Sequence, residues 1–284
     1  GFLPREHVAL MHPRQAKRVW DADTQHKAAD VLAYVQAHGP VHPRQIEQHF
    51  AQGNVTHYWG GSSSATTHLL DGMHYRGMLR VVRRDSGTRV YEAVAHPPTD
   101  DSPASRAQRA AALVALVVHK YAPLPAASLT YLVRLLGYGA PHLAPQIQTA
   151  LRLAKQELAS CQINGTTWYW PADENPASRR HTPDGAVRLL APFDPVVWDR
   201  RRFTLLWDWT YKFEAYTPAP QRKLGYYALP LLWHDRVIGW ANVTAPQGHM
   251  VVNFGYADKA PQGADFRAAL DDELQRMAYF LAAH

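Results

Sequence analysis

The order of helical and extended segments is the feature that most constrains what this chain can fold into. Its first copy starts with residues 26–39, whose apolar side chains recur at helical spacing and end at Gly39, a suitable helix C-cap. A turn leads to a second short helix with Pro43 at its first position. A Gly-Gly and serine loop then leads to a third helix over Thr66–Tyr75, which ends at Gly77. The apolar face of the first helix is expected to carry Ala29, Val31, Leu32 and Val35.

A β-hairpin is expected directly after the third helix. Residues 78–84 and 88–94 are β-branched segments, and Asp85-Ser86-Gly87 between them is a turn sequence. Three helices followed by a hairpin is the order of the winged-helix variant of helix-turn-helix, whose third helix usually enters the major groove of DNA. The order therefore predicts a DNA-binding unit, with a protein-binding winged helix as the alternative.

The same order recurs after a proline-rich linker at residues 97–103. Asn164-Gly165 is the expected turn of a second hairpin. This hairpin is nearly uncharged and carries Trp168 and Trp170 on one face, which favours packing between domains over stacking on a base. The expected helices of this second copy cover residues 107–121, 124–137 and about 143–158.

The segment at residues 189–232 combines aromatic strand formers with clustered arginines and lysines. Cations suit phosphates and rings suit a displaced base, whereas a β-rich core with a solvated basic rim explains the same composition. Asp194, in a rigid turn, is expected to cap backbone N–H groups rather than to act as a base. A hairpin tip at His234-Asp235, a strand in MVVNFGYA and a final amphipathic helix over residues 265–283 are expected to follow.

Charge and composition narrow the partners. The formal net charge of +6 favours an anionic partner such as nucleic acid, although a modest excess of arginine also serves solubility. The 16 histidines are expected to strengthen polyanion binding below about pH 6.5. The single cysteine, Cys161, excludes an intramolecular disulfide and is expected to be a small core residue on a strand.

Motifs for several kinds of chemistry are missing from the sequence. The histidines lack metal-ligand spacing, so neither a metal nor a cofactor is expected. The zinc-protease, P-loop and hydrolase-elbow motifs are absent, and no nucleophile is marked. Since no stretch approaches the roughly 20 apolar residues of a membrane span, a protein of the reducing cytoplasm is expected.

Several stretches carry a resemblance to a known family. LLAPFDPVVWDRRR, EAYTPAPQRKLGYYALPLL, KAADVLAYVQAHGPVHPRQIE and GFLPREHVALMHPR resemble the YcaQ/AlkZ family of DNA glycosylases. The resemblance covers essentially the whole chain and is most specific over residues 189–232. It implies an α+β fold of tandem winged-helix domains followed by a C-terminal β-barrel-like domain with a terminal helix, which together form a cradle around duplex DNA.

The implied parts are a connecting segment at residues 1–25, winged-helix domains at 26–96 and 104–185 joined by the linker 97–103, and a β-rich domain at 186–284. The implied activity is hydrolysis of the N-glycosidic bond of alkylated or crosslinked bases. Alkylation makes the base a cationic leaving group, so the enzyme needs only to stabilise an oxocarbenium-like sugar and to position a water.

The catalytic element of this family is a Gln-hydrophobic-Asp or Gln-hydrophobic-Gln motif in the first winged helix. The resemblance places that motif before Gly1, so no catalytic residue is assigned and enzymatic activity is left open. Gln146-Ile147-Gln148 and Gln45-Ile46-Glu47 are similar to this motif in sequence, but they do not lie in the first winged helix of the family, so the similarity is read as coincidence. A lost domain would also be expected to leave an apolar patch around Phe2, Leu3 and Leu10.

The candidate DNA-binding residues are hydroxyl-bearing, imidazole and cationic side chains of the third helix, the first hairpin and the 189–232 segment. They are Thr66, Thr67, His68, Arg76, Arg83, Arg84, Arg200, Arg201, Arg202, Arg222 and Lys223. The expected partner is double-stranded DNA, bound by a monomer associated with the bacterial nucleoid and not with a membrane. The alternatives are a winged-helix transcriptional regulator without enzymatic activity and a protein-binding scaffold.

Overall fold

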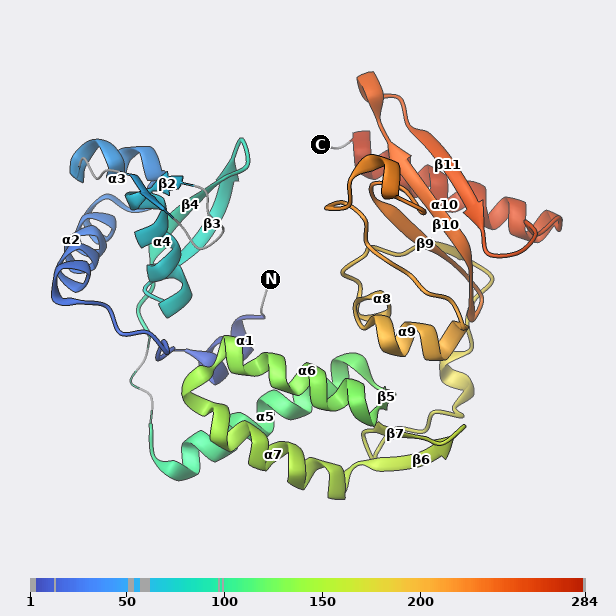
Figure 1. The fold of residues 1–284 in the computed structure, drawn as a ribbon, viewed down its shortest axis with the longest axis horizontal. Helices are drawn as coiled ribbons and strands as arrows, with labels where there is room; N and C mark the ends of the chain where they lie inside the picture. Colours follow the sequence, from blue (N-terminus) through green and yellow to red (C-terminus); the bar gives the residue numbers. More distant parts are fainter. Residues whose placement is uncertain are drawn as a thin grey trace. The chain divides into compact units, whose positions relative to one another are not determined.

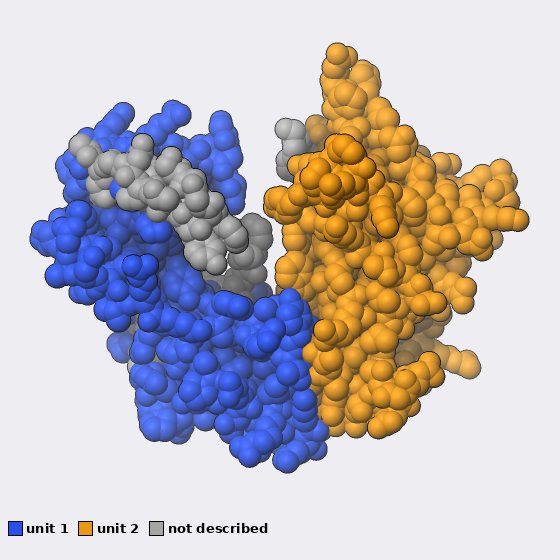
Figure 2. Space-filling view, in the orientation of Figure 1, with its two compact units in different colours: residues 1–117, 130–157 blue, residues 118–129, 158–284 orange. Residues whose placement is uncertain are grey.

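A computed structural model describes residues 4–12, 14–50, 54–56, 62–96, 98 and 100–282. Helices and strands both contribute, which confirms the α+β class. The chain divides into unit 1, residues 1–117 and 130–157, and unit 2, residues 118–129 and 158–284 (Figure 2). These units do not coincide with the predicted domains, whose boundaries stay a prediction.

The first part of unit 1 contains the predicted three helices and hairpin (Figure 1). Its elements are α1 (Arg5–Met11), α2 (Ala22–His38), α3 (Pro43–Phe50), β1 (Asn54–Thr56), β2 (Ser62–Ser64), α4 (Ala65–Arg76), β3 (Leu79–Asp85) and β4 (Thr88–Ala93). Asp21 caps α2 by accepting from the Thr24 N–H, and Gly39 ends it with a φ of 73°. An antiparallel bridge between Val41 and Tyr91 ties the α2–α3 turn to the hairpin.

Two details of this region differ from the sequence-based expectation. Ala28, and not Ala29, faces the core beside Val31 and Val35. The serine run is not a loop throughout, because Ser62–Ser64 forms β2 and pairs with β1. The hairpin turn is as predicted, since Ser86 and Gly87 both adopt the positive φ that a two-residue turn requires.

The second set of helices follows the proline-rich linker. Its elements are α5 (Pro103–Tyr121), β5 (Leu124–Pro125), α6 (Ala126–Gly139), a 3-10 turn η1 (Pro141–Leu143), α7 (Ala144–Glu157), β6 (Ala159–Ile163) and β7 (Thr166–Trp170). The predicted hairpin at Asn164-Gly165 is confirmed, and the short β5 joins it in a three-stranded sheet of order β5-β7-β6. Cys161 lies on β6 as predicted, but the expectation of a core residue was wrong, because residues 160–163 of this edge strand are all exposed.

The C-terminal part of unit 2 is built on a four-stranded antiparallel sheet of order β11-β10-β9-β8. Its elements are η2 (Arg179–His181), β8 (Val187–Leu189), α8 (Pro195–Trp198), α9 (Arg200–Trp207), η3 (Ala219–Gln221), β9 (Ala228–Trp233), β10 (Arg236–Thr244), η4 (Pro246–Gly248), β11 (Val251–Tyr256) and α10 (Ala264–Ala282). α10 lies behind the sheet in the view of Figure 1 and contacts β8, where the buried Glu273 carboxylate accepts a 2.7 Å bond from the Leu189 N–H. The hairpin tip at His234-Asp235 and the final helix are confirmed.

The sheet of unit 2 corrects two expectations. Consecutive strands pair as a meander, and β8 and β11 are its two edges among the described strands, so the sheet is open and not barrel-like. The aromatic segment is not extended throughout, because residues 195–207 are mostly helical. Caps explain this helical stretch: the side chains of Asp194 and Asp199 accept from the N–H groups of Val196 and Arg202.

No helix among the described residues is long and apolar enough to cross a membrane. Phe2 and Leu3, where an exposed apolar patch was expected, lie outside the described residues.

Candidate nucleic-acid interface

Exposed aromatic side chains gather in unit 2 within the 189–232 segment. Tyr216 is 92% exposed, Tyr226 60% and Phe193 57%. Large rings in such numbers are rarely left in water without a partner. The cluster, called the aromatic surface below, consists of Phe193, Trp198, Phe213, Tyr216, Tyr226 and Tyr227.

Phe213 lies at the centre of the aromatic surface. Its ring centroid is 5.4 Å from that of Phe193, 5.2 Å from Tyr227 and 6.1 Å from Tyr216. Phe193 in turn lies 5.6 Å from Trp198 at the end of α8. All four pairs meet edge to face or tilted, an arrangement that stabilises ring clusters and leaves ring faces open.

A buried carboxylate holds the loop that carries these rings. Glu214 is 3% exposed, and its Oε2 accepts bonds of 2.8 Å from the Lys223 N–H and 2.7 Å from the Leu224 N–H. Burial would raise the pKa of Glu214, but the N–H groups of Leu224, Lys223 and Gly225 outweigh it and the pKa lies below its ordinary value. The carboxylate therefore stays ionised at neutral pH and joins residue 214 to the 222–225 turn.

We expect Glu214→Ala to lower the free energy of unfolding by about 2 kcal/mol, because it leaves the buried Lys223 and Leu224 N–H groups without their acceptor. The folded-state pKa is depressed, so this stabilisation is present at neutral pH and is lost as the pH falls through that pKa. Urea titration at pH 7 and pH 3 measures it. An equal difference between wild type and variant at both pH values would contradict the assignment.

The three consecutive arginines of α9 have different surroundings. Arg202 is 4% exposed, and its guanidinium donates to the carbonyls of Tyr121 and Pro195. Arg200 donates to the carbonyls of Val197 and Pro192 and lies 4.4 Å from the centroid of the Tyr211 ring. Arg201 alone of the three is exposed, and its side chain makes no hydrogen bond or ion pair with any described residue.

The two cations of the 222–225 turn, Arg222 and Lys223, also have different surroundings. Arg222 donates a 2.8 Å bond from Nε to the Thr217 carbonyl and lies 4.9 Å from the centroid of the Tyr226 ring. The Lys223 side chain is exposed and has no hydrogen-bond or ion-pair partner among the described residues. Of the predicted residues in unit 2, Arg201 and Lys223 are thus the cations free to meet a phosphate.

The predicted residues on α4 of unit 1 are divided in the same way. Thr67 and His68 are exposed, whereas Thr66 is 1% exposed and faces the core. The Arg76 guanidinium stacks 3.6 Å from the centroid of the Trp20 ring and donates to the carbonyls of Gly72 and Arg18. Burial lowers the pKa of Arg76 below its ordinary value. Arg76 therefore holds the segment before α2 against α4.

The hairpin arginines of unit 1 lie at the surface near the turn. Arg83 forms a paired contact with Asp85, with bonds of 2.9 and 3.1 Å, so its charge is matched within the hairpin. Arg84 is exposed and donates to the Gly87 carbonyl. The structure thus brings Arg83 and Arg84 together at one hairpin end.

The sequence predicted the cations as DNA-binding residues but did not predict which individual rings form the aromatic surface. The aromatic letters of residues 193–227 were visible, yet nothing in their spacing shows which rings are exposed. Tyr211 is buried and donates to the Ala228 carbonyl, whereas Tyr216, five positions on, is in solvent. The turn that the Glu214 carboxylate organises makes this difference.

The structure supports neither a metal site nor a catalytic role for Gln146-Ile147-Gln148. Among the described residues, no group of three or more His, Cys, Asp or Glu side chains could hold a metal ion. Gln146-Ile147-Gln148 lies within α7, where Ile147 is buried.

Comparison with known proteins gives a match over nearly the whole chain. A family model described as DNA glycosylase AlkZ-like matches residues 2–280. The matched residues include the whole aromatic surface. No solved structure matches the chain.

Proposed function

This chain belongs to the AlkZ-like DNA glycosylase family, and from that premise we propose that it binds duplex DNA through the aromatic surface of unit 2 and through α4 and the hairpin of unit 1. The observation that supports this proposal best is the aromatic surface itself, where Tyr216 is 92% exposed. Rings that are open to solvent provide stacking for a displaced base, and the free cations of the same unit, Arg201 and Lys223, provide charge for the phosphates around it.

The helical parts support the same proposal. We propose that residues 22–93 and 103–170 are two winged-helix domains, because each has three helices followed by a hairpin. In the first of them the Val41–Tyr91 bridge adds a third, minimal strand to the hairpin. Thr67, His68 and Arg84 are then the exposed groups available to a DNA groove and its phosphates.

The proposed reaction is hydrolysis of the N-glycosidic bond of an alkylated or crosslinked base. A base that alkylation has made cationic stacks favourably on neutral, electron-rich rings such as Tyr216 and Tyr226. Arg201 and Lys223 are proposed to hold the phosphates, and Arg200 and Arg202 to hold the protein's own backbone. We assign no catalytic group among the described residues.

Binding of the whole chain to a fluorescent duplex, followed by anisotropy at increasing salt, tests the proposal. We expect little preference for sequence and an affinity that falls steeply with salt, with the logarithm of the binding constant dropping by about 0.9 per phosphate contact for each tenfold rise in salt. A binding constant that does not change between low and high salt would argue against phosphate contacts. A sharp preference for one sequence would favour the regulator instead.

A further inference from the structure

A second group of basic side chains, separate from the aromatic surface, lies within unit 1. It joins the segment after α1, the segment after β4, the first turns of α5 and the η1–α7 turn. Its members, called the basic cluster below, are His12, Arg14, His96, Arg109 and His142, with Gln146 four residues after His142 on α7. Nothing in the proposed DNA contacts uses these residues.

Contacts bring the first half of the basic cluster together. The rings of His12 and His96 stack at 5.5 Å with an 11° angle, and His96 Nε2 lies 2.7 Å from the Gly77 carbonyl oxygen. Gly77 has a φ of +82°, and a Cβ there would meet both imidazoles, so the close approach needs glycine. Arg14 donates a 2.7 Å bond to the Tyr75 carbonyl at the end of α4.

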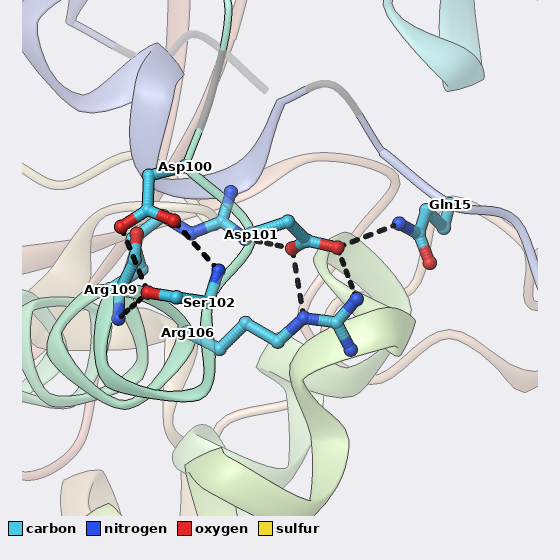
Figure 3. Close-up of polar contacts among 7 residues, drawn as sticks. Gln15, Asp100, Asp101, Ser102, Arg106 and Arg109 are labelled. Atoms are coloured by element: carbon cyan, nitrogen blue, oxygen red, sulfur yellow. Dashed lines mark hydrogen bonds and ion pairs between the residues drawn. The ribbon is translucent and has the colours of Figure 1, made fainter.

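The second half is organised around one carboxylate, Asp101 (Figure 3). Its Oδ1 accepts bonds of 2.8 Å from Arg106 Nε and 3.2 Å from Arg109 Nη2, and Gln15 reaches the other oxygen. Asp101 thereby connects the segment after α1 to the start of α5. Its side chain is 41% exposed, so this edge of the cluster is open to solvent.

Several buried polar atoms of the basic cluster have no hydrogen-bond partner among the described residues. Arg109 is 8% exposed, yet its Nε and Nη1 make no hydrogen bond. The same holds for the buried atoms Arg14 Nε, His12 Nδ1, both ring nitrogens of His142, and Gln146 Oε1. An unmatched buried polar group costs about 1–3 kcal/mol, so native proteins keep few of them, and several in one place mark a site for an ion or ordered water.

The charges decide which kind of ligand complements these atoms. Arg106 and Arg109 pair with Asp101, Arg14 lies near His142, and Asp100 lies near Arg109, so three guanidiniums meet two carboxylates and an excess of positive charge remains. Burial together with Arg14, His96, His74 and His142 lowers the pKa of His12 to about 4, and burial together with Arg109 lowers that of His142. A cation is disfavoured here, whereas an anion with several acceptor oxygens would meet the unmatched donors.

We propose that the basic cluster is a phosphate-binding site, in which Arg109, Arg14 and His142 donate to the phosphate oxygens. The Gln146 side-chain oxygen would accept from a protonated phosphate oxygen. Free inorganic phosphate and a phosphodiester of DNA offer the same oxygens to these donors. Binding would hold the segment after α1, α4 and the second set of helices to one another, because each contributes a ligand or a neighbour of one.

Titration calorimetry of the full chain with inorganic phosphate, at ionic strength matched with chloride, tests the site. We expect one phosphate per chain, bound at least about tenfold more weakly by Arg109→Gln, which removes the guanidinium charge, and by His142→Gln, which removes the imidazole N–H from its position. Arg152→Gln on the exposed side of α7 is the matched control and should bind as wild type does. His142→Gln keeps the test valid if Arg109→Gln fails to fold.

The outcome that overturns the proposal is the absence of any phosphate heat above that of chloride, or equal affinity in all three variants. A competition arm identifies the source of the phosphate. If a short duplex displaces inorganic phosphate, the site takes a DNA phosphodiester, and if both bind together, it takes the free ion. Repeating the titration with a variant of Arg201 and Lys223, which lie outside the cluster, separates this site from the proposed DNA surface.

Discussion

Exchanging Arg201 and Lys223 together for glutamate is expected to weaken duplex DNA binding by at least about tenfold while leaving the melting temperature unchanged. Both side chains are exposed and have no ion-pair or hydrogen-bond partner among the described residues, so the fold does not depend on them. Reversing their charge removes two phosphate contacts and adds repulsion. The salt slope should fall by about 2 units, which anisotropy titrations at several salt concentrations measure.

The same change of charge elsewhere on unit 2 provides the control. Arg236 lies at the β9–β10 hairpin and Arg267 on α10, and both are exposed. Arg236→Glu with Arg267→Glu alters the net charge equally but should leave most of the affinity in place. If both double variants lost affinity alike, net charge alone would explain binding and the aromatic surface would not be the interface.

Replacing Arg202, next to Arg201 on α9, should lower the stability of the fold, which the exchange of Arg201 and Lys223 leaves unchanged. We expect Arg202→Ala to lower the free energy of unfolding by about 3 kcal/mol, because the carbonyls of Tyr121 and Pro195 lose a charged donor and a buried side chain leaves a cavity. Asp199, which is 4% exposed, also loses its neighbouring positive charge. Urea unfolding followed by tryptophan fluorescence measures the change.

Arg201→Ala is the matched control for this stability prediction, since it shortens the neighbouring side chain of the same helix. Its effect should stay within about 0.5 kcal/mol, as for other surface substitutions. Arg202→Lys should recover only part of the loss, because an ammonium cannot serve two carbonyls with the geometry of a guanidinium. Similar stabilities for Arg201→Ala and Arg202→Ala would contradict the structural role of Arg202.

The sequence predicted the elements that local chemistry determines. Pro43 begins a helix, Gly39 ends one, and Ser86-Gly87 and Asn164-Gly165 supply the two positive φ values of their hairpin turns. These residues act through their own backbone preferences, so they can be recognised without knowing the rest of the molecule. The three helices and the hairpin of each copy followed from them, whereas α1 and the short strands β1, β2 and β5 were not predicted.

Tertiary contacts determined what the sequence could not. Residues 200–202 are all arginine, and only the packing of α9 distinguishes them. Arg201 is exposed to solvent, whereas Arg200 and Arg202 donate to backbone carbonyls. The 189–232 segment has strand-forming aromatics, yet aspartate caps at 194 and 199 start helices there. The basic cluster gathers residues from 12 to 146, a separation that no local pattern reports.

The surface position of Cys161 on β6 has a practical consequence for experiments on this protein. It is the single cysteine of the chain, and it is exposed. A maleimide dye would therefore attach at one known place in the unaltered protein, on a hairpin outside the aromatic surface and the basic cluster. The same thiol would crosslink two molecules under air oxidation, so preparations for the binding measurements need a reductant.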